Sequence, residues 1–134
     1  MIKFELGGYY LDNGGRVQLP LILQPSISQV MNYLSILEGH SGVLVLDNDQ
    51  EDKYVPYKMV LYSEYSIYMV LLETSMEDGD IDVRTFYNES YARELIPILG
   101  ESLSKASTVK DFSYVIKAFK EFYEAGDVNR GLLN

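Results

Sequence analysis

Residues 108–126 constrain the fold most, because they carry the longest regular apolar pattern in the chain. Large apolar residues recur there at offsets 0, 3, 4, 7, 10 and 11, which is one face of an α-helix: Phe112, Val115, Ile116, Phe119, Phe122 and Tyr123. Thr108 and Asp111 form a helix-start signal, and Gly126 stands where a left-handed C-terminal cap belongs. A helix with so broad an apolar face must lie on a large apolar surface, which the rest of the chain is predicted to supply.

The preceding residues indicate one further helix and several strands. Ser26 and Gln29 form a capping box, and apolar residues follow at helical spacing as far as Gly39. The pair Asn13–Gly14 predicts a loop or a tight hairpin near the start of the chain, returning through residues 16–19. Strands are predicted at residues 2–6, 42–46, 54–62, 67–72 and 81–87.

The links between the later strands are short, and short links require antiparallel pairing. Residues 88–107 show no clear pattern of either helix or strand. We therefore predict a single domain spanning residues 1–134, of the α+β class, in which an antiparallel β-meander of about four to five strands carries two helices packed on one face.

Negative charge is concentrated in one part of the chain. The net charge is −9, and residues 47–82 alone hold ten acidic residues against two lysines, a sum of −8. Such a field repels nucleic acid and anionic membranes and attracts a basic partner. A simpler interpretation, in which the charge serves solubility alone, stays open at this point.

The residue chemistry favours a protein that is not an enzyme. The chain has no cysteine and one histidine, His40, which follows a predicted helix end where an imidazolium complements the helix dipole. Asp78, Asp80 and Asp82 imitate the spacing of a calcium loop, but Val83 occupies the position that requires glycine. No pair of carboxylates is singled out among the twenty acidic residues. We predict no catalytic residue, no metal and no cofactor.

Surface recognition is the remaining candidate for function. Tyrosine offers a large contact area with a polar tip, and the chain has twelve tyrosines, several of them in the predicted strands. These tyrosines are equally compatible with ordinary half-buried strand positions. The residues predicted to bind a partner are Asp47, Asp49, Glu51, Asp52, Tyr54, Tyr57, Tyr65, Glu77, Asp78, Asp80 and Asp82.

The apolar runs stop at about eight residues, which is too short for a membrane span. The first residues lack the apolar core of a signal peptide, and together with the absence of cysteine this leads us to expect a cytoplasmic protein.

Several segments together resemble a known family. They are residues 7–15, 83–88, 98–100, 118–128 and 132–134. In this order they resemble small bacterial immunity proteins that accompany polymorphic toxins of the contact-dependent growth inhibition type, whereas residues 20–75 match weakly. The resemblance implies a cytoplasmic antitoxin that binds the C-terminal domain of its cognate toxin one to one and occludes the active site. Toxins of this kind are often nucleases and hence basic, which fits the charge of residues 47–82.

Two alternatives remain beside this expectation. An acidic secretion chaperone fits the size and charge, but such chaperones usually open with a helix and form dimers, whereas this chain opens with a strand and glycine turns. The other alternative is a protein-binding module with a different partner. For an immunity protein we expect a monomer when unbound, with no nucleic acid or membrane as partner.

Overall fold

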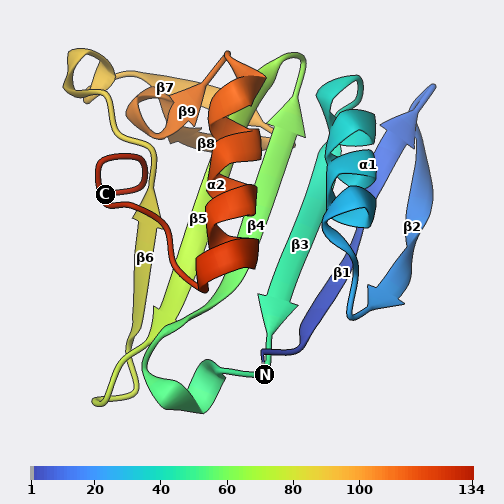
Figure 1. The fold of residues 1–134 in the computed structure, drawn as a ribbon. Helices are drawn as coiled ribbons and strands as arrows, with labels where there is room; N and C mark the ends of the chain where they lie inside the picture. The colour runs from blue at the N-terminus through green and yellow to red at the C-terminus, as the bar shows by residue number, and fades with distance from the viewer. Residues whose placement is uncertain (1) are drawn as a thin grey trace.

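One antiparallel sheet organises the computed structural model, which describes residues 2–134 (Figure 1). Its strands are β1 (Phe4–Asp12), β2 (Gly15–Leu23), β3 (Gly42–Asn48), β4 (Pro56–Glu64), β5 (Ile67–Ser75), β6 (Ile81–Thr85) and β9 (Thr108–Val109). The order is β2-β1-β3-β4-β5-β6, and β9 pairs with β5. The α+β class is confirmed, but the predicted four to five strands are too few. The sheet has seven, because the β1–β2 hairpin belongs to it and β9 adds a further short strand.

The sheet is not a simple meander, since β1 lies between β2 and β3. Both of these strands pair antiparallel with β1, so they run parallel to each other. Parallel strands need a long connection, and α1 (Ile27–Glu38) provides it by crossing over one face of the sheet. The predicted capping box starts this helix, with Ser26 as its N-cap and Gln29 as the third residue.

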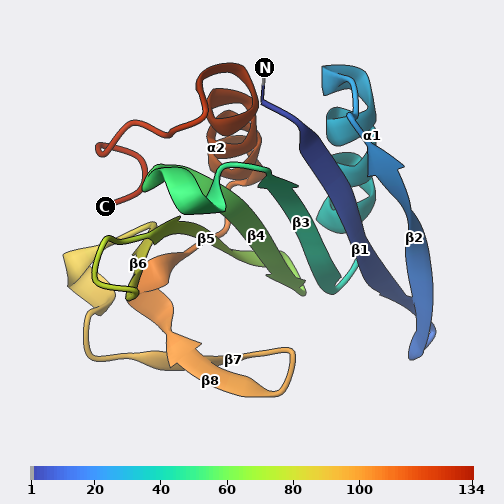
Figure 2. The ribbon, with the colours of Figure 1, turned by 90° about the horizontal axis from the view of Figure 1, so that it is seen from below.

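Both helices lie side by side on the same face of the sheet, as predicted (Figures 1 and 2). The second is α2 (Phe112–Ala125), whose N-cap is Asp111 and whose C-terminus is capped by Gly126 at φ 74°. Its predicted apolar face is buried against the sheet through Phe112, Val115, Phe119 and Phe122. No helix within residues 2–134 combines the length and the apolar character needed to cross a membrane.

The end of α1 is anchored to the sheet by two hydroxyl groups. The fully buried Ser63 hydroxyl lies 3.0 Å from the Leu37 carbonyl oxygen and 2.8 Å from that of His40. The Tyr68 hydroxyl donates to the Glu38 carbonyl oxygen at 3.1 Å. The last carbonyl groups of a helix have no partner within it, so these contacts satisfy them and fix the position of α1 on β4 and β5.

A glycine permits the close approach of β1 and β3 where they pair. A Cβ atom at Gly42 would lie 2.3 Å from the Tyr9 carbonyl oxygen and 2.7 Å from the Tyr10 Cα atom. Both neighbours are backbone atoms and cannot move aside without disturbing the sheet.

We expect Gly42→Ala to lower the free energy of unfolding by about 2–3 kcal/mol, as overpacking does in a well-filled core. Urea denaturation measures this change. Gly7→Ala is the matched control on β1, because its Cβ would meet only the mobile Leu21 Cδ1 atom at 3.3 Å. Equal losses for the two variants would contradict the close-approach explanation.

The C-terminal residue pairs with the last residue of β6. The backbone N–H of Asn134 donates to the Thr85 carbonyl oxygen at 2.9 Å, and Leu133 is fully buried. Beneath this segment lies the Arg84 side chain, which is only 4% exposed and donates to the carbonyl oxygens of Leu133 and Val128 and to Asp127. Arg84 therefore joins β6, the end of α2 and the C-terminus.

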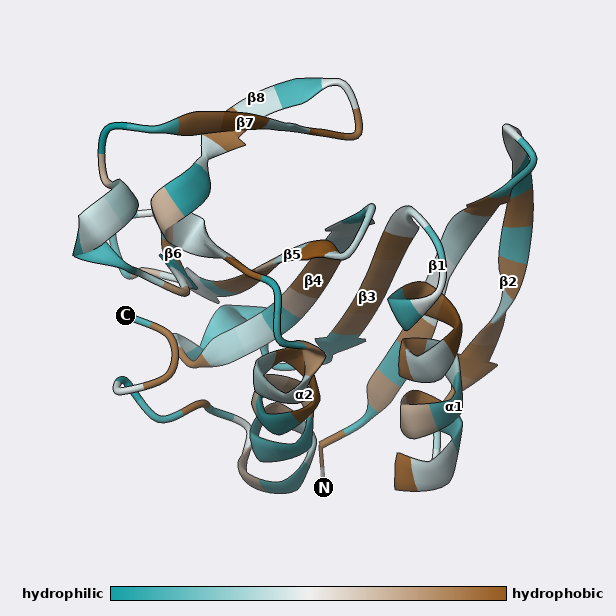
Figure 3. Ribbon diagram, turned by 90° about the horizontal axis from the view of Figure 1, so that it is seen from above, coloured by the Kyte–Doolittle hydropathy of each residue, from teal (hydrophilic) through white to brown (hydrophobic). Residues whose placement is uncertain are grey.

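Residues 86–107 leave the sheet on the face opposite the helices. They contain a short 3-10 helix, η2 (Glu89–Tyr91), and a hairpin of β7 (Leu95–Ile98) and β8 (Glu101–Ser104). Figures 2 and 3 show this hairpin and the two helices on opposite sides of the sheet. The predicted strand 81–87 ends earlier, at Thr85, and the hairpin occupies the section in which the sequence showed no pattern.

Candidate functional site

The acidic segments of the sequence meet at one end of the sheet, which we call the acidic end. Asp47 lies near the end of β3, Asp49 directly follows this strand, and Glu51 and Asp52 lie in the 3-10 helix η1 (Glu51–Lys53). Four more predicted residues lie in or beside the β5–β6 turn: Glu77, Asp78, Asp80 and Asp82. Figure 1 shows η1 and the β5–β6 turn at the same end, because antiparallel strands return both segments to one edge.

Few cations neutralise the acidic end. Two ion pairs are present among residues 2–134, Arg84–Asp127 and Lys105–Glu94, and neither involves the predicted acidic residues. Asp49 is instead held by hydrogen bonds to its Oδ1 atom, from the Gln50 side chain at 2.7 Å and from the Lys3 backbone N–H at 3.3 Å. The acidic end is therefore available to an external cation or a basic surface.

The three predicted tyrosines lie in three different environments. Tyr54 follows η1, takes a left-handed backbone conformation at φ 60° and is exposed at the acidic end. Tyr57 is buried, and its hydroxyl donates to Glu73 at 3.5 Å. Tyr65 is highly exposed but lies in the β4–β5 turn, at the opposite end of the sheet. The structure thus brings Tyr54 to the acidic residues and separates Tyr65 from them.

A second surface is the sheet face opposite the helices, and Asp47 is one of the predicted residues that lies on it. We call it the open face. Its residues form three rows across neighbouring strands, set by the pairing register and by the alternation of side chains along each strand. The tyrosine row is Tyr9, Val43, Tyr62 and Met69, the valine row is Gly7, Val45, Val60 and Leu71, and the charged row is Glu5, Asp47, Lys58 and Glu73.

The β7–β8 hairpin stands over part of the open face and forms a cavity with it. The cavity has a volume of about 340 Å³. Its floor is the tyrosine row with Leu71, and its outer wall is Ile98, Leu99, Glu101 and Leu103. The sequence contained one signal of this surface. Residues 42–46 and 67–72 are apolar without alternation, which indicates strands that are covered on both faces.

A sequence model of one protein family matches residues 3–132, which is almost the whole chain. The chain belongs to DUF6911, a family of unknown function. This DUF6911 protein is also similar to a solved structure, described as the crystal structure of a hypothetical protein from Neisseria gonorrhoeae. The two share 28% sequence identity with a TM-score of 0.81, over 96% of this chain and 91% of the other. Among curated proteins, the comparison finds no match.

The charged row of this DUF6911 protein contains one carboxyl group with an unfavourable environment. Burial raises the pKa of Asp47 above its ordinary value, the Glu5 carboxylate raises it further, and Lys58 opposes the rise. The folded state therefore holds this proton more tightly than the unfolded state does. Ionised Asp47 lowers stability at neutral pH, and this cost disappears as the pH falls and the carboxyl becomes neutral.

We expect Asp47→Asn to be more stable than the original protein at neutral pH. This advantage should vanish as the pH is lowered through the titration of Asp47, which thermal unfolding across pH 3–7 measures. Asp49→Asn is the control with the opposite sign, since hydrogen bonds from Gln50 and Lys3 lower the pKa of Asp49. That variant should lose stability at neutral pH and match the original protein in acid. The same sign for both variants would contradict this assignment.

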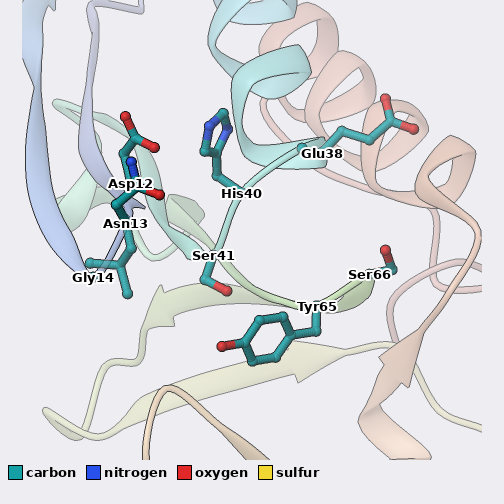
Figure 4. Close-up of a pocket in the computed structure, with 10 residues that line it drawn as sticks. Asp12, Asn13, Gly14, Glu38, His40, Ser41, Tyr65 and Ser66 are labelled. Carbon is teal, nitrogen blue, oxygen red and sulfur yellow. The ribbon is translucent and has the colours of Figure 1, made fainter.

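A larger hollow, of about 540 Å³, lies at the opposite end of the DUF6911 protein, between the β1–β2 turn and the end of α1 (Figure 4). His40 lines it, and its Nδ1 atom lies 2.8 Å from the Ile36 carbonyl oxygen. A carbonyl oxygen only accepts hydrogen bonds, so Nδ1 is the protonated nitrogen that donates in this contact. The imidazole ring also packs against the Tyr10 ring, with 4.6 Å between the ring centroids. These contacts give His40 a structural role at the helix end. Across residues 2–134, no group of three or more potential metal ligands comes together.

Proposed function

We propose that this chain is an immunity protein, which binds the C-terminal domain of a cognate toxin one to one in the cytoplasm and blocks its active site. The observation that supports this proposal is the convergence of residues 47–52 and 77–82 at one end of the sheet, without ion pairs to neutralise them. The resemblance of the chain ends to immunity proteins of contact-dependent growth inhibition systems supports it independently. A basic toxin domain, such as a nuclease, is the partner that this charge would select.

Each part of the proposed interaction has a physical basis. Complementary charge raises the rate of encounter between two proteins and excludes partners of like charge. The acidic end would compete with the polyanionic substrate of a nuclease for the same basic surface of the toxin. Tyr54, exposed beside η1, would then add contact area as the two surfaces close.

Co-expression with the toxin domain encoded by the neighbouring gene tests the proposed function. Cells that produce the active toxin should survive only when this chain is present, and the two proteins should elute as a one-to-one complex. A catalytically inactive toxin variant controls for toxicity from expression alone. Death of the cells despite folded, abundant immunity protein would overturn the proposal. A stable homodimer of the unbound chain in light scattering would instead favour a chaperone-like function.

A further inference from the structure

We propose that the open face is a docking surface in addition to the acidic end, and that the cavity beneath the β7–β8 hairpin receives an apolar side chain of the partner while the charged row receives a basic one. The inference rests on the proposed function for the identity of the partner, but not for the existence of the surface. It concerns residues other than those of η1 and the β5–β6 turn.

The apolar part of this surface is incompletely covered. Val60 and Met69 are buried, whereas Tyr9, Val43, Val45, Tyr62 and Leu71 remain half-buried. At the β2 edge, Leu21 lies over Gly7 with its side chain 63% exposed, and Leu23 beside Glu5 is 65% exposed. A continuous apolar strip therefore extends from β2 to the hairpin. Apolar strips of this kind, bordered by charged residues, are typical of protein-binding sites.

The cavity is suited to a single large side chain. Its volume of about 340 Å³ is at the lower end of the range of pockets that enclose ligands, roughly 300–1,000 Å³. Its lining consists of aromatic and aliphatic side chains of both the sheet and the hairpin, with Glu101 as the one charged residue. An aromatic or branched aliphatic residue filling such a pocket is the usual anchor of a protein interface.

The charge of the open face decides between the available occupants. Three carboxylates and one lysine form the charged row, and the chain carries a net charge of −9. A second copy of this chain would bring Asp47 and Glu73 towards carboxylates of the same kind, which is unfavourable. A basic side chain would instead relieve the half-buried Asp47, whose ionised form has no ion-pair partner within the described residues. The occupant is therefore a basic protein segment.

The distance between the cavity and the charged row further specifies the basic segment of the partner. The cavity residue Val43 and the charged-row residue Asp47 are four residues apart on β3, or about 13 Å at 3.3 Å per residue. An extended segment in the same orientation would place its basic residue about four positions from its apolar anchor. This requirement gives a probe that is independent of any toxin.

To test the inference, the synthetic peptide Trp-Thr-Ser-Thr-Lys-Lys is titrated into the full chain, and the NMR chemical-shift changes of the chain's backbone amides are measured. The expected shifts cluster at residues 43–47, 60–62, 69–73 and 98–103. One control peptide replaces tryptophan with serine, and a second replaces both lysines with glutamate. Both should bind at least fivefold more weakly. Shifts confined to residues 49–52 and 77–80, equal binding of the serine peptide, or no shift at millimolar peptide would each overturn the inference.

Two variants of the hairpin provide a matched pair. Leu103 lines the cavity from β8, whereas Leu95 on β7 is 68% exposed and lies outside it. Leu103→Ser should weaken peptide binding about fivefold or more, and Leu95→Ser should leave it unchanged. Thermal unfolding is used to check that both variants are folded. If Leu103→Ser is unfolded, the more conservative Leu103→Ala is tested in its place. Equal effects of the two positions would overturn the inference.

The outcomes separate this inference from the proposed function. If the peptide maps to the open face but co-expression gives no protection, the docking surface stands and the immunity function fails. If the chain neutralises its toxin while Leu103→Ser and Leu95→Ser bind that toxin equally well, the immunity function stands and the open face is not its docking surface.

Discussion

Replacing Arg84 with methionine is expected to lower the free energy of unfolding by about 3–5 kcal/mol. The guanidinium group donates to the carbonyl oxygens of Val128 and Leu133 in a buried position, and methionine retains the aliphatic stem but no donor. Each buried acceptor that loses its partner costs roughly 1–3 kcal/mol. Urea denaturation measures the loss, and faster hydrogen exchange at Asn134 would show that the C-terminal segment is released first.

Asp127→Asn is the matched control for Arg84. The Asp127 side chain is 58% exposed, and its ion pair with Arg84 at 2.8 Å is therefore well solvated on one side. We expect this variant to cost less than about 1 kcal/mol, as exposed ion pairs do. A small loss for Arg84→Met, or a loss of similar size for the two variants, would show that the carbonyl contacts do not hold the C-terminus.

Reversing three carboxylates of the acidic end is expected to slow association with the proposed toxin partner roughly tenfold or more at low salt. The variant changes Asp49, Glu51 and Asp52 to lysine and leaves Asp47 on the open face intact. Because long-range attraction is screened by ions, the dependence of the association rate on salt should also flatten. Stopped-flow fluorescence over a series of salt concentrations measures both effects.

The control for this variant makes the same change of net charge at the other end of the sheet. Asp12, Glu38 and Glu64 lie at the ends of β1, α1 and β4, away from the acidic end. β4 spans nine residues, so the two ends are separated by roughly 30 Å, well beyond the screening length of about 10 Å in 0.1 M salt. Lysine at these three positions should alter the rate much less. Equal slowing by both variants would assign the effect to total charge and remove η1 from the interface.

The helices were predictable from sequence because their signals are local. The apolar spacing of residues 112–123 and the caps at Ser26 and Gly126 each involve neighbouring turns of one helix, and the structure confirms them. Pro56 is a further local signal, because proline within a strand is typical of an edge position or a bulge, and the register of β4 shifts between Pro56 and Lys58. These features depend on contacts within a few residues.

The features that the sequence did not specify are short strands and the residue rows of the open face, which depend on contacts far apart in the chain. β7 and β8 have four residues each, too few for a reliable periodic pattern, and β9 has two. The two ends of residues 86–107 are held together by a hydrogen bond from the Asn88 N–H to the Ala106 carbonyl oxygen, eighteen positions later in the chain. The sequence did not specify the rows of the open face for the same reason, because each row joins residues of four different strands.

In the candidate site, too, some features follow from the sequence itself and others from contacts between distant residues. The acidic residues were identified by composition, and the strand order then brought both segments to one end. Composition cannot distinguish Tyr57 from Tyr65. Tyr57 is buried beside the bulge at Pro56, whereas β4 carries Tyr65 to the opposite end of the sheet.

The pairing of β6 and β9 with the same edge of β5 has a consequence for how residues 86–107 can vary in length. β6 ends opposite Leu71 and β9 resumes opposite Met69, so the two occupy that edge like one strand interrupted by residues 86–107. The interruption begins and ends at nearly the same place, and changes in loop length between fixed ends cost little free energy. We therefore expect changes in the length of this interruption to leave the sheet and its helices intact.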